Sequence, residues 1–243
     1  MMTAKFLDLA AVASYLHLTS ADVERRVKNR EIPFERRGER IVFRRSEIDV
    51  WASQRILGLP DQRLVSYHEK STLNTRTMLM NERLLPEMLQ AGALAPAMTS
   101  KTKASVLRDL VALAEKSGNL LDAQSLLASL VAREACCSTA MPGGFALPHP
   151  RSQEPYRFET SFLVVGRPVQ EIHFSAPDGQ PTYLFFLICC QDDRLHLHTL
   201  ARLSLMAQKT KMLEQLRNAP DAEGMRDCLI AAEAEVLAGR RVV

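Results

Sequence analysis

Residues 138–149 read STAMPGGFALPH, and this stretch says more about fold and chemistry than any other part of the 243-residue chain. Its glycine pair, Gly143 and Gly144, allows backbone amides to approach an anion closely. Pro148 stiffens the chain immediately before His149. A neutral imidazole at such a loop suits a group that accepts and passes on a phosphoryl unit, because fixed donors can hold the oxygens while a ring nitrogen attacks. The spacing by itself equally allows a structural histidine.

Helix and strand patterns alternate on both sides of this stretch. Apolar residues at helical spacing predict helices around 106–114, 121–130, 195–207 and 228–237, and strand-like runs occupy 161–165 and 182–190. This alternation predicts an α/β layered domain over residues 84–243, with a mixed sheet flanked by helices.

Residues 1–57 have a different pattern, that of a small, mostly helical domain with one β-hairpin. Leu9, Val12 and Leu16 predict a first helix, and Thr19 to Asp22 form a capping-box pattern that begins a second helix over 20–28. Two helices joined so closely predict a helix-turn-helix.

The hairpin and a third helix follow. Two strand-like runs surround Gly38, which predicts a hairpin with a basic tip. A second capping-box pattern, Ser46 to Asp49, precedes a helical face that includes Trp51. Helix, turn, helix, hairpin and helix together predict a winged helix-turn-helix domain. Residues 58–83, where periodicity fades, are interpreted as a linker with a possible dimerising helix around 75–82.

The positive charge is concentrated in the first domain. Residues 1–57 hold 11 Lys/Arg and 8 Asp/Glu, whereas the remaining 20 of each cancel, so the whole excess of +3 lies there. A basic stripe of this kind is typical of a nucleic-acid partner, although a charge run can also be an ordinary solvated face.

The stretch LAAVASYLHLTSADVERRVKNREIPFERRGERIVFRRSEIDVWASQ, within residues 6–57, resembles the MerR/excisionase type of winged helix-turn-helix domain. The resemblance implies that 20–28 is the recognition helix and the hairpin is the wing. Arg26 replaces a common apolar core residue, and Arg30 replaces a glycine that usually ends the helix. The residues expected to contact double-stranded DNA are Ser20, Arg25 and Lys28 on the helix and Arg36, Arg37 and Arg40 on the wing.

The C-terminal region resembles type-2 enzyme IIA domains of the phosphotransferase system, the fructose/mannitol and nitrogen-regulatory branch. Three blocks carry the resemblance in order: STAMPGGFALPH, VVGRPVQEIHFSAPDGQPTYLFFLICC and HLHTLARLSLMAQ. It implies that His149 is phosphorylated, that His196 is its active-site partner and that Arg133 helps to bind the phosphoryl charge. Ser138 and Thr139 fall at positions of hydroxyl donors. His198, two positions beyond His196 on a helix, is expected to point elsewhere.

Three residues depart from the enzyme IIA pattern: Ala140, Pro142 and Pro150. They make the loop stiffer and remove an amide donor, so we still expect phosphate acceptance, with a low rate or a sensor that has lost phosphorylation as the alternatives.

Five cysteines, four of them vicinal, match neither a disulfide framework nor a C-x-x-C site. We interpret them as small buried hydrophobes in a reducing cytoplasm. A zinc site combining His149, His196 and the cysteine pairs is an alternative without conventional ligand spacing. The preferred interpretation includes no metal and no cofactor.

These patterns lead to one main hypothesis: a cytoplasmic, DNA-binding transcriptional regulator controlled by phosphorylation of His149. Its expected partners are a histidine phosphocarrier protein as phosphate donor, duplex DNA and a second copy of the chain, with no membrane. The alternative is a phosphocarrier acting on protein partners, with a weak or non-DNA-binding N-terminal domain. A third possibility is an enzyme IIA-like sensor that no longer reacts. Enzymatic activity stays open and extends at most to carrying a phosphohistidine, since no complete transporter is encoded here.

Overall fold

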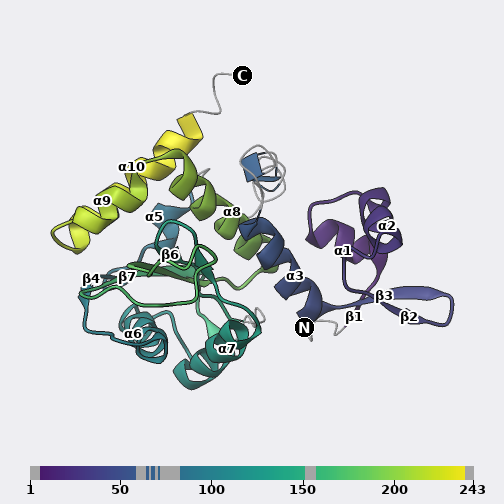
Figure 1. Ribbon diagram of the computed structural model, residues 1–243, viewed down its shortest axis with the longest axis horizontal. Helices are drawn as coiled ribbons and strands as arrows, with labels where there is room; N and C mark the ends of the chain where they lie inside the picture. Colours follow the sequence, from purple (N-terminus) through teal and green to yellow (C-terminus); the bar gives the residue numbers. More distant parts are fainter. Residues whose placement is uncertain are drawn as a thin grey trace.

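The computed structural model describes residues 6–58, 64–65, 67–68, 71, 83–150 and 157–238, which form a small N-terminal domain and a larger C-terminal α/β domain (Figure 1). The predicted winged helix-turn-helix is confirmed. Its elements are β1 (Phe6–Leu7), α1 (Leu9–Tyr15), α2 (Ser20–Lys28), β2 (Glu35–Arg37), β3 (Arg40–Arg44) and α3 (Arg45–Leu57). The order β1-β3-β2 makes a three-stranded antiparallel sheet. The short strand β1 was not predicted, because two residues show no periodicity.

Capping explains where the helices of the N-terminal domain begin. The Asp8 carboxylate accepts a hydrogen bond from the amide of Ala11 at 2.8 Å and caps α1. Thr19 caps α2 as predicted, since its hydroxyl accepts from the amide of Asp22 at 3.1 Å. Asp22, however, accepts from the Thr19 hydroxyl and from Arg25, so the reciprocal half of the capping box is absent.

The second predicted capping box is wrong. Helix α3 begins at Arg45, one residue before Ser46, and it has no side-chain cap. Asp49 lies inside the helix, is buried and accepts a hydrogen bond from the Tyr15 hydroxyl at 2.9 Å. Because the Asp49 carboxylate accepts from Tyr15 inside the protein, it does not cap the start of α3.

Arg26 and Arg30, which depart from the helix-turn-helix family pattern, differ from ordinary surface arginines in burial or backbone conformation. Arg30 adopts a left-handed backbone with φ of 56°, the conformation for which glycine is normally used. Arg26 is mostly buried, forms an ion pair with Glu31 at 3.3 Å and keeps its Nε without a hydrogen-bond partner.

The C-terminal domain is built on a five-stranded mixed sheet in the order β4-β7-β8-β6-β5, which confirms the predicted fold class. Its strands are β4 (Leu94–Met98), β5 (Ala140–Met141), β6 (Phe145–Ala146), β7 (Phe162–Pro168) and β8 (Leu184–Cys189). Its helices are α5 (Leu85–Met88), α6 (Lys103–Lys116), α7 (Ala123–Cys136), α8 (Asp193–Lys209), α9 (Met212–Asn218) and α10 (Ala222–Ala238). Leu121, which was expected inside the second of the predicted helices, precedes α7 and is exposed.

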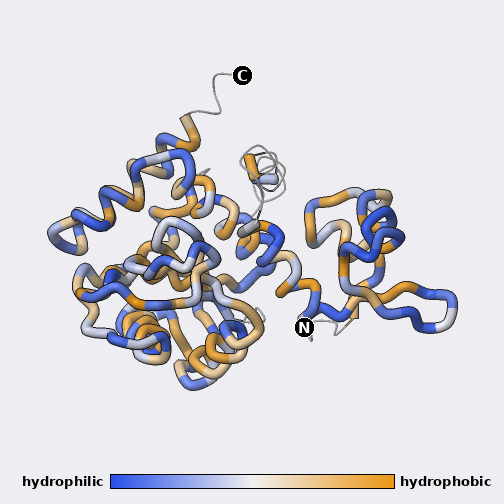
Figure 2. Tube along the Cα trace, in the orientation of Figure 1, coloured by the Kyte–Doolittle hydropathy of each residue, from blue (hydrophilic) through white to orange (hydrophobic). Residues whose placement is uncertain are grey.

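The central strand β8 is buried on both faces, which explains its uninterrupted apolar sequence. Phe185 and Leu187 pack with α6 and α7, whereas Phe186 and Ile188 pack with α8, α9 and α10. Helices therefore cover both sides of the sheet (Figure 1), and the apolar residues of Figure 2 lie mainly where these layers meet. The core of the N-terminal domain belongs to the same apolar cluster as the α8 side.

A buried polar network connects residues 68 and 71 with α8 and α10. The His68 ring stacks on that of His198, with centroids 5.0 Å apart, and Arg202 Nε donates to His68 Nε2 at 2.6 Å. Arg202 also pairs with Glu233 at 2.5 Å. The helix predicted around 75–82 lies outside the described residues, and the domain limits at 57 and 84 stay predictions.

The cysteine interpretation is correct for only part of the set. Cys189 and Cys190 are buried, and burial raises the pKa of Cys190 to about 12. Cys136 is exposed and Cys137 is half-buried, contrary to the expectation for all of them. In the described part of the chain, no three His, Cys, Asp or Glu side chains are grouped to hold a metal ion. No helix within the described ranges has the length and apolar character to cross a membrane.

Candidate functional site

A short hairpin places His149 at the edge of the sheet. Strands β5 and β6 pair antiparallel, and Gly143 and Gly144 form their turn with φ of 95° and 80°. A Cβ on Gly144 would lie 2.2 Å from the Tyr183 ring, so only glycine fits there. After β6 the chain continues beside β8, where the Pro148 carbonyl accepts from the amide of Ile188 at 2.9 Å.

The glycine pair does not have the role that the sequence suggested. The Gly143 amide donates to the Asp178 carboxylate at 3.1 Å, and the Gly144 carbonyl accepts from Tyr183 at 2.8 Å. Both glycines thus shape the hairpin and do not line the cavity next to His149.

Hydrogen bonds determine which nitrogen of His149 has the free electron pair. Its Nδ1 lies 2.8 Å from the Leu147 carbonyl oxygen, which can only accept, so Nδ1 carries the hydrogen. Nε2 then has the free electron pair and accepts from Arg133 Nε at 3.0 Å. Burial, followed by the charge of Arg133, lowers the pKa of His149 well below its usual value. The ring is therefore neutral at physiological pH, with Nε2 as its basic atom.

The buried guanidinium of Arg133 has one nitrogen without a hydrogen-bond partner. Arg133 belongs to the last turn of α7 and is almost fully buried. Its Nη1 donates to the Cys137 carbonyl at 3.0 Å, whereas its buried Nη2 has no hydrogen-bond partner. A guanidinium held beside a nucleophile with a donor to spare can bind a phosphoryl oxygen.

His196 lies in the first turns of α8, which begins after the Asp192 cap. Its ring centroid is 4.8 Å from that of His149, as the resemblance implied. Burial and Arg133 lower the pKa of His196 to about 3, so this ring is neutral too. Its Nδ1 is buried without a partner. His198 points away from this site, as predicted, and its Nδ1 lies 2.8 Å from the Ser71 hydroxyl.

Ser138 and Thr139 are not brought to the cavity. The Ser138 hydroxyl donates to the Phe174 carbonyl at 2.5 Å, and the Thr139 hydroxyl donates to Glu134 at 2.6 Å. The Thr139 carbonyl accepts from the amide of Leu147 at 3.0 Å. In this arrangement the two residues brace the loop that carries His149, because their hydroxyl hydrogens are already engaged.

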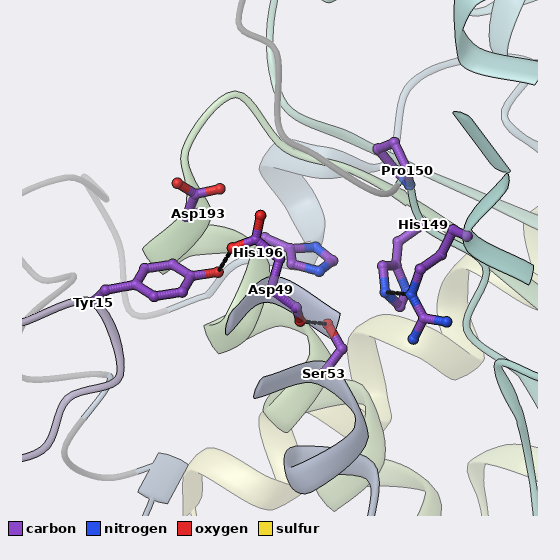
Figure 3. Close-up of a pocket in the computed structure, with 8 residues that line it drawn as sticks. Tyr15, Asp49, Ser53, His149, Pro150, Asp193 and His196 are labelled. Carbon is purple, nitrogen blue, oxygen red and sulfur yellow. Dashed lines mark hydrogen bonds between the residues drawn. The ribbon is translucent and has the colours of Figure 1, made fainter. Parts of the chain in front are cut away.

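The N-terminal domain contributes side chains that the sequence did not predict for this site. One cavity is lined by Tyr15 of α1, Asp49 and Ser53 of α3, and residues of the C-terminal domain, namely Arg133, His149, Pro150, Asp193 and His196 (Figure 3). Helix α3 packs along α8, which places Asp49 between Tyr15 and the two histidines. The sequence pattern assigned Asp49 to a capping box and not to the site, and no local pattern indicated Tyr15 as a site residue.

The predicted DNA-contact residues form a separate, exposed surface. Ser20, Arg25 and Lys28 on α2 are exposed, as are Arg36, Arg37 and Arg40 on the wing. The β2–β3 hairpin extends away from the C-terminal domain (Figure 1). Other basic residues are engaged internally: Arg44 pairs with Glu35 at 2.5 Å, and Arg45 pairs with Asp193.

The fold and the site together define a helix-turn-helix domain joined to an enzyme IIA-type domain. The chain belongs to the family described as "Phosphoenolpyruvate-dependent sugar phosphotransferase system, EIIA 2", which residues 87–231 match. Residues 6–56 match a second family, described as "Helix-turn-helix domain".

Individual relatives cover the C-terminal domain. The chain is 28% identical over 148 residues to the nitrogen regulatory protein of Pseudomonas aeruginosa, covering 60% of this chain and 94% of that protein. It is 27% identical over 147 residues to the PTS system fructose-specific EIIABC component of Bacillus subtilis, covering 60% of this chain but only 23% of that relative.

Solved structures show the same fold. The nitrogen regulatory protein IIA-Ntr of Neisseria meningitidis superimposes with a TM-score of 0.53 at 26% identity, covering 59% of this chain and 97% of that one. The IIA mannitol structure from Escherichia coli has a TM-score of 0.51 at 16% identity and covers 58% and 98%, respectively.

Proposed function

We propose that this chain is a DNA-binding transcriptional regulator whose activity is controlled by phosphoryl transfer to His149. The observation that supports this most directly is the pairing of a neutral, basic Nε2 with a buried arginine that has a free donor. Such a pair is expected of a phosphoryl acceptor and is of little use to a purely structural histidine, which would have no need of an unsatisfied guanidinium nitrogen.

The proposed transfer follows from these contacts. The lone pair of His149 Nε2 attacks the phosphorus of a donor phosphohistidine, and the donor's P–N bond breaks with its electron pair returning to the donor ring. His149 keeps its Nδ1 hydrogen, bonded to the Leu147 carbonyl throughout. Arg133 must leave Nε2 and turn its Nε and Nη2 donors to the phosphoryl oxygens. The phosphoryl group then has close to two negative charges, and the ring that keeps its Nδ1 hydrogen has one positive charge.

The DNA side of the proposal rests on an exposed basic surface. The Arg25 side chain is 63% exposed and pairs with the carboxylate of Asp22, and Arg37 on the wing pairs with Glu35. Lys28, one helical turn further on, is also exposed. Charges on a recognition helix and wing suit the phosphates of duplex DNA.

The acceptor is tested by incubation with phosphoenolpyruvate, enzyme I and the histidine phosphocarrier protein, followed by intact mass measurement. We expect an acid-labile adduct of one phosphoryl group on the wild type, lost in His149→Ala. The matched control is His173→Ala, which removes an exposed histidine away from the cavity and is expected to keep the adduct. Absence of the adduct from wild-type protein would contradict phosphoryl control.

The regulator is distinguished from the carrier by binding to duplex DNA selected from a random library. Arg25→Ala with Lys28→Ala is expected to abolish the affinity and to reduce its salt dependence. The control pair, Lys101→Ala with Arg108→Ala, removes two exposed charges from the C-terminal domain. Equal loss in both double variants, or no loss in either, would favour the phosphocarrier.

A further inference from the structure

The face through which His149 would be phosphorylated is covered by the protein's own N-terminal domain. His149 and His196 are only 2% and 3% exposed. Their cavity is closed on the opposite side by Tyr15, Asp49 and Ser53 (Figure 3). Any donor must approach Nε2 from this cavity, because Nδ1 faces the Leu147 carbonyl.

The cavity is too small for the reaction. The cavity has a volume of about 10 Å³, which leaves room for about one water molecule. A phosphoryl group adds one phosphorus and three oxygens, and its donor brings a further imidazole ring. Phosphorylation therefore requires α1 and α3 to move away from the site.

The contacts that hold the N-terminal domain in place surround this cavity. Arg45 of α3 forms an ion pair with Asp193, the first residue of α8. Arg194 Nη2 donates to the Ser14 hydroxyl at 2.8 Å.

A third contact joins α3 to the residue that follows α7. Gln54 Nε2 donates to Cys137 Sγ at 2.9 Å, and the same sulfur accepts from Arg133 at 3.2 Å. These three contacts are polar, whereas the core of the N-terminal domain also belongs to the apolar cluster on the α8 side, so opening must separate apolar contacts as well.

We propose that helices α1 and α3 are an autoinhibitory lid, such that lid closure and phosphorylation of His149 exclude each other. This inference rests on the proposed function and specifies its regulation. Because the coupling of two equilibria is reciprocal, a phosphoryl group on His149 disfavours lid closure by the same free energy by which lid closure disfavours the phosphorylated state.

The negative charge of Asp49 disfavours lid closure over a phosphorylated His149. The buried Oδ2 of Asp49 has no hydrogen-bond partner, and the carboxylate lies in the same cavity as His149. A phosphoryl dianion introduced there repels this carboxylate in a poorly solvated space. The contact residues on α2 and the wing stay exposed in the closed state, so opening changes the position of the DNA-binding surface and leaves its accessibility unchanged.

The test compares initial phosphorylation rates of full-length variants with the same phosphorylated histidine phosphocarrier protein. Arg45→Glu turns the ion pair with Asp193 into a repulsion, and we expect phosphorylation about tenfold faster or more. Asp49→Asn removes the buried negative charge, strengthens closure and slows phosphorylation several-fold. Arg108→Glu, the same charge reversal on the exposed face of α6, is the matched control and leaves the rate unchanged.

Hydrogen exchange of residues 45–57 provides a second readout. We expect exchange in α3 to rise when the wild type is phosphorylated, and to be high in Arg45→Glu already without phosphate. Equal rates in wild type and Arg45→Glu would overturn the lid while leaving the proposed function intact. Absence of phosphorylation in every variant, the opened one included, would overturn the proposed function and the lid with it.

Discussion

Replacing Asp49 by asparagine should change how the stability of the N-terminal domain depends on pH. Burial raises the pKa of Asp49 from 3.8 to about 6, although the Tyr15 hydroxyl and the charge of Arg45 oppose the shift. The folded protein therefore binds this proton more tightly than the unfolded chain does. The resulting stabilisation is fully present below pH 3.8 and is lost as the pH rises through about 6.

The magnitude follows from the size of the shift. Each pKa unit corresponds to about 1.4 kcal/mol, so the ionised carboxylate of Asp49 costs about 3 kcal/mol of unfolding free energy at pH 7 relative to the protonated form. Asparagine keeps an oxygen for the Tyr15 hydroxyl and leaves one buried amide without a partner, which offsets about 1–3 kcal/mol of that gain. The difference between variant and wild type should therefore increase by about 2 kcal/mol from pH 4 to pH 7.

The assay uses Trp51, the single tryptophan, which lies on α3 together with Asp49. Urea unfolding followed by its fluorescence at several pH values gives the free energy of the N-terminal domain in each protein. Asp227→Asn, on the exposed face of α10, is the matched control and should show no such trend. A difference between Asp49→Asn and wild type that stays constant from pH 4 to pH 7 would refute the reasoning, since Asp49 would then titrate alike in the folded and unfolded chain.

Three further substitutions test the packing. Gly144→Ala should cost about 2–5 kcal/mol in denaturant unfolding, because its Cβ would meet the Tyr183 ring at a positive φ, whereas Gly38→Ala, which meets open space, should cost only about 1 kcal/mol. Arg30→Gly should raise the stability of the N-terminal domain by about 0.5–1 kcal/mol by relieving a left-handed backbone, and a lower melting temperature would contradict this. Glu233→Ala should cost about 3–5 kcal/mol in calorimetry, because it removes the buried carboxylate that accepts from Arg202 and from the amides of Leu84 and Leu85; a loss below 1 kcal/mol would show that these contacts contribute little.

Local patterns were sufficient to predict much of the architecture. Helical spacing located α2, α6, α8 and α10, and two apolar runs located β7 and β8. These elements are long enough for their periodicity to show which face is buried. Strands β1, β5 and β6 have two residues each and were not predicted, since such short strands exist only through pairing with neighbours.

Sequence patterns likewise predicted some residues of the candidate site correctly and misassigned others. The sequence alone indicated His149, His196 and Arg133, and the fold brings these three together. It misassigned Ser138 and Thr139, because a hydroxyl near a site in sequence can be engaged elsewhere in space. Its glycine pair shapes a hairpin, since the partner of a backbone amide depends on the loop packed against it.

Sequence patterns alone predicted a helix-turn-helix domain and an α/β domain, and the resemblance to enzyme IIA domains singled out His149, because each of these signals lies within one segment. That Asp49 and Tyr15 face His149 across a domain boundary became visible in the three-dimensional structure. Contacts between residues about 100 positions apart depend on how two finished domains pack, and no periodicity in either segment records that packing.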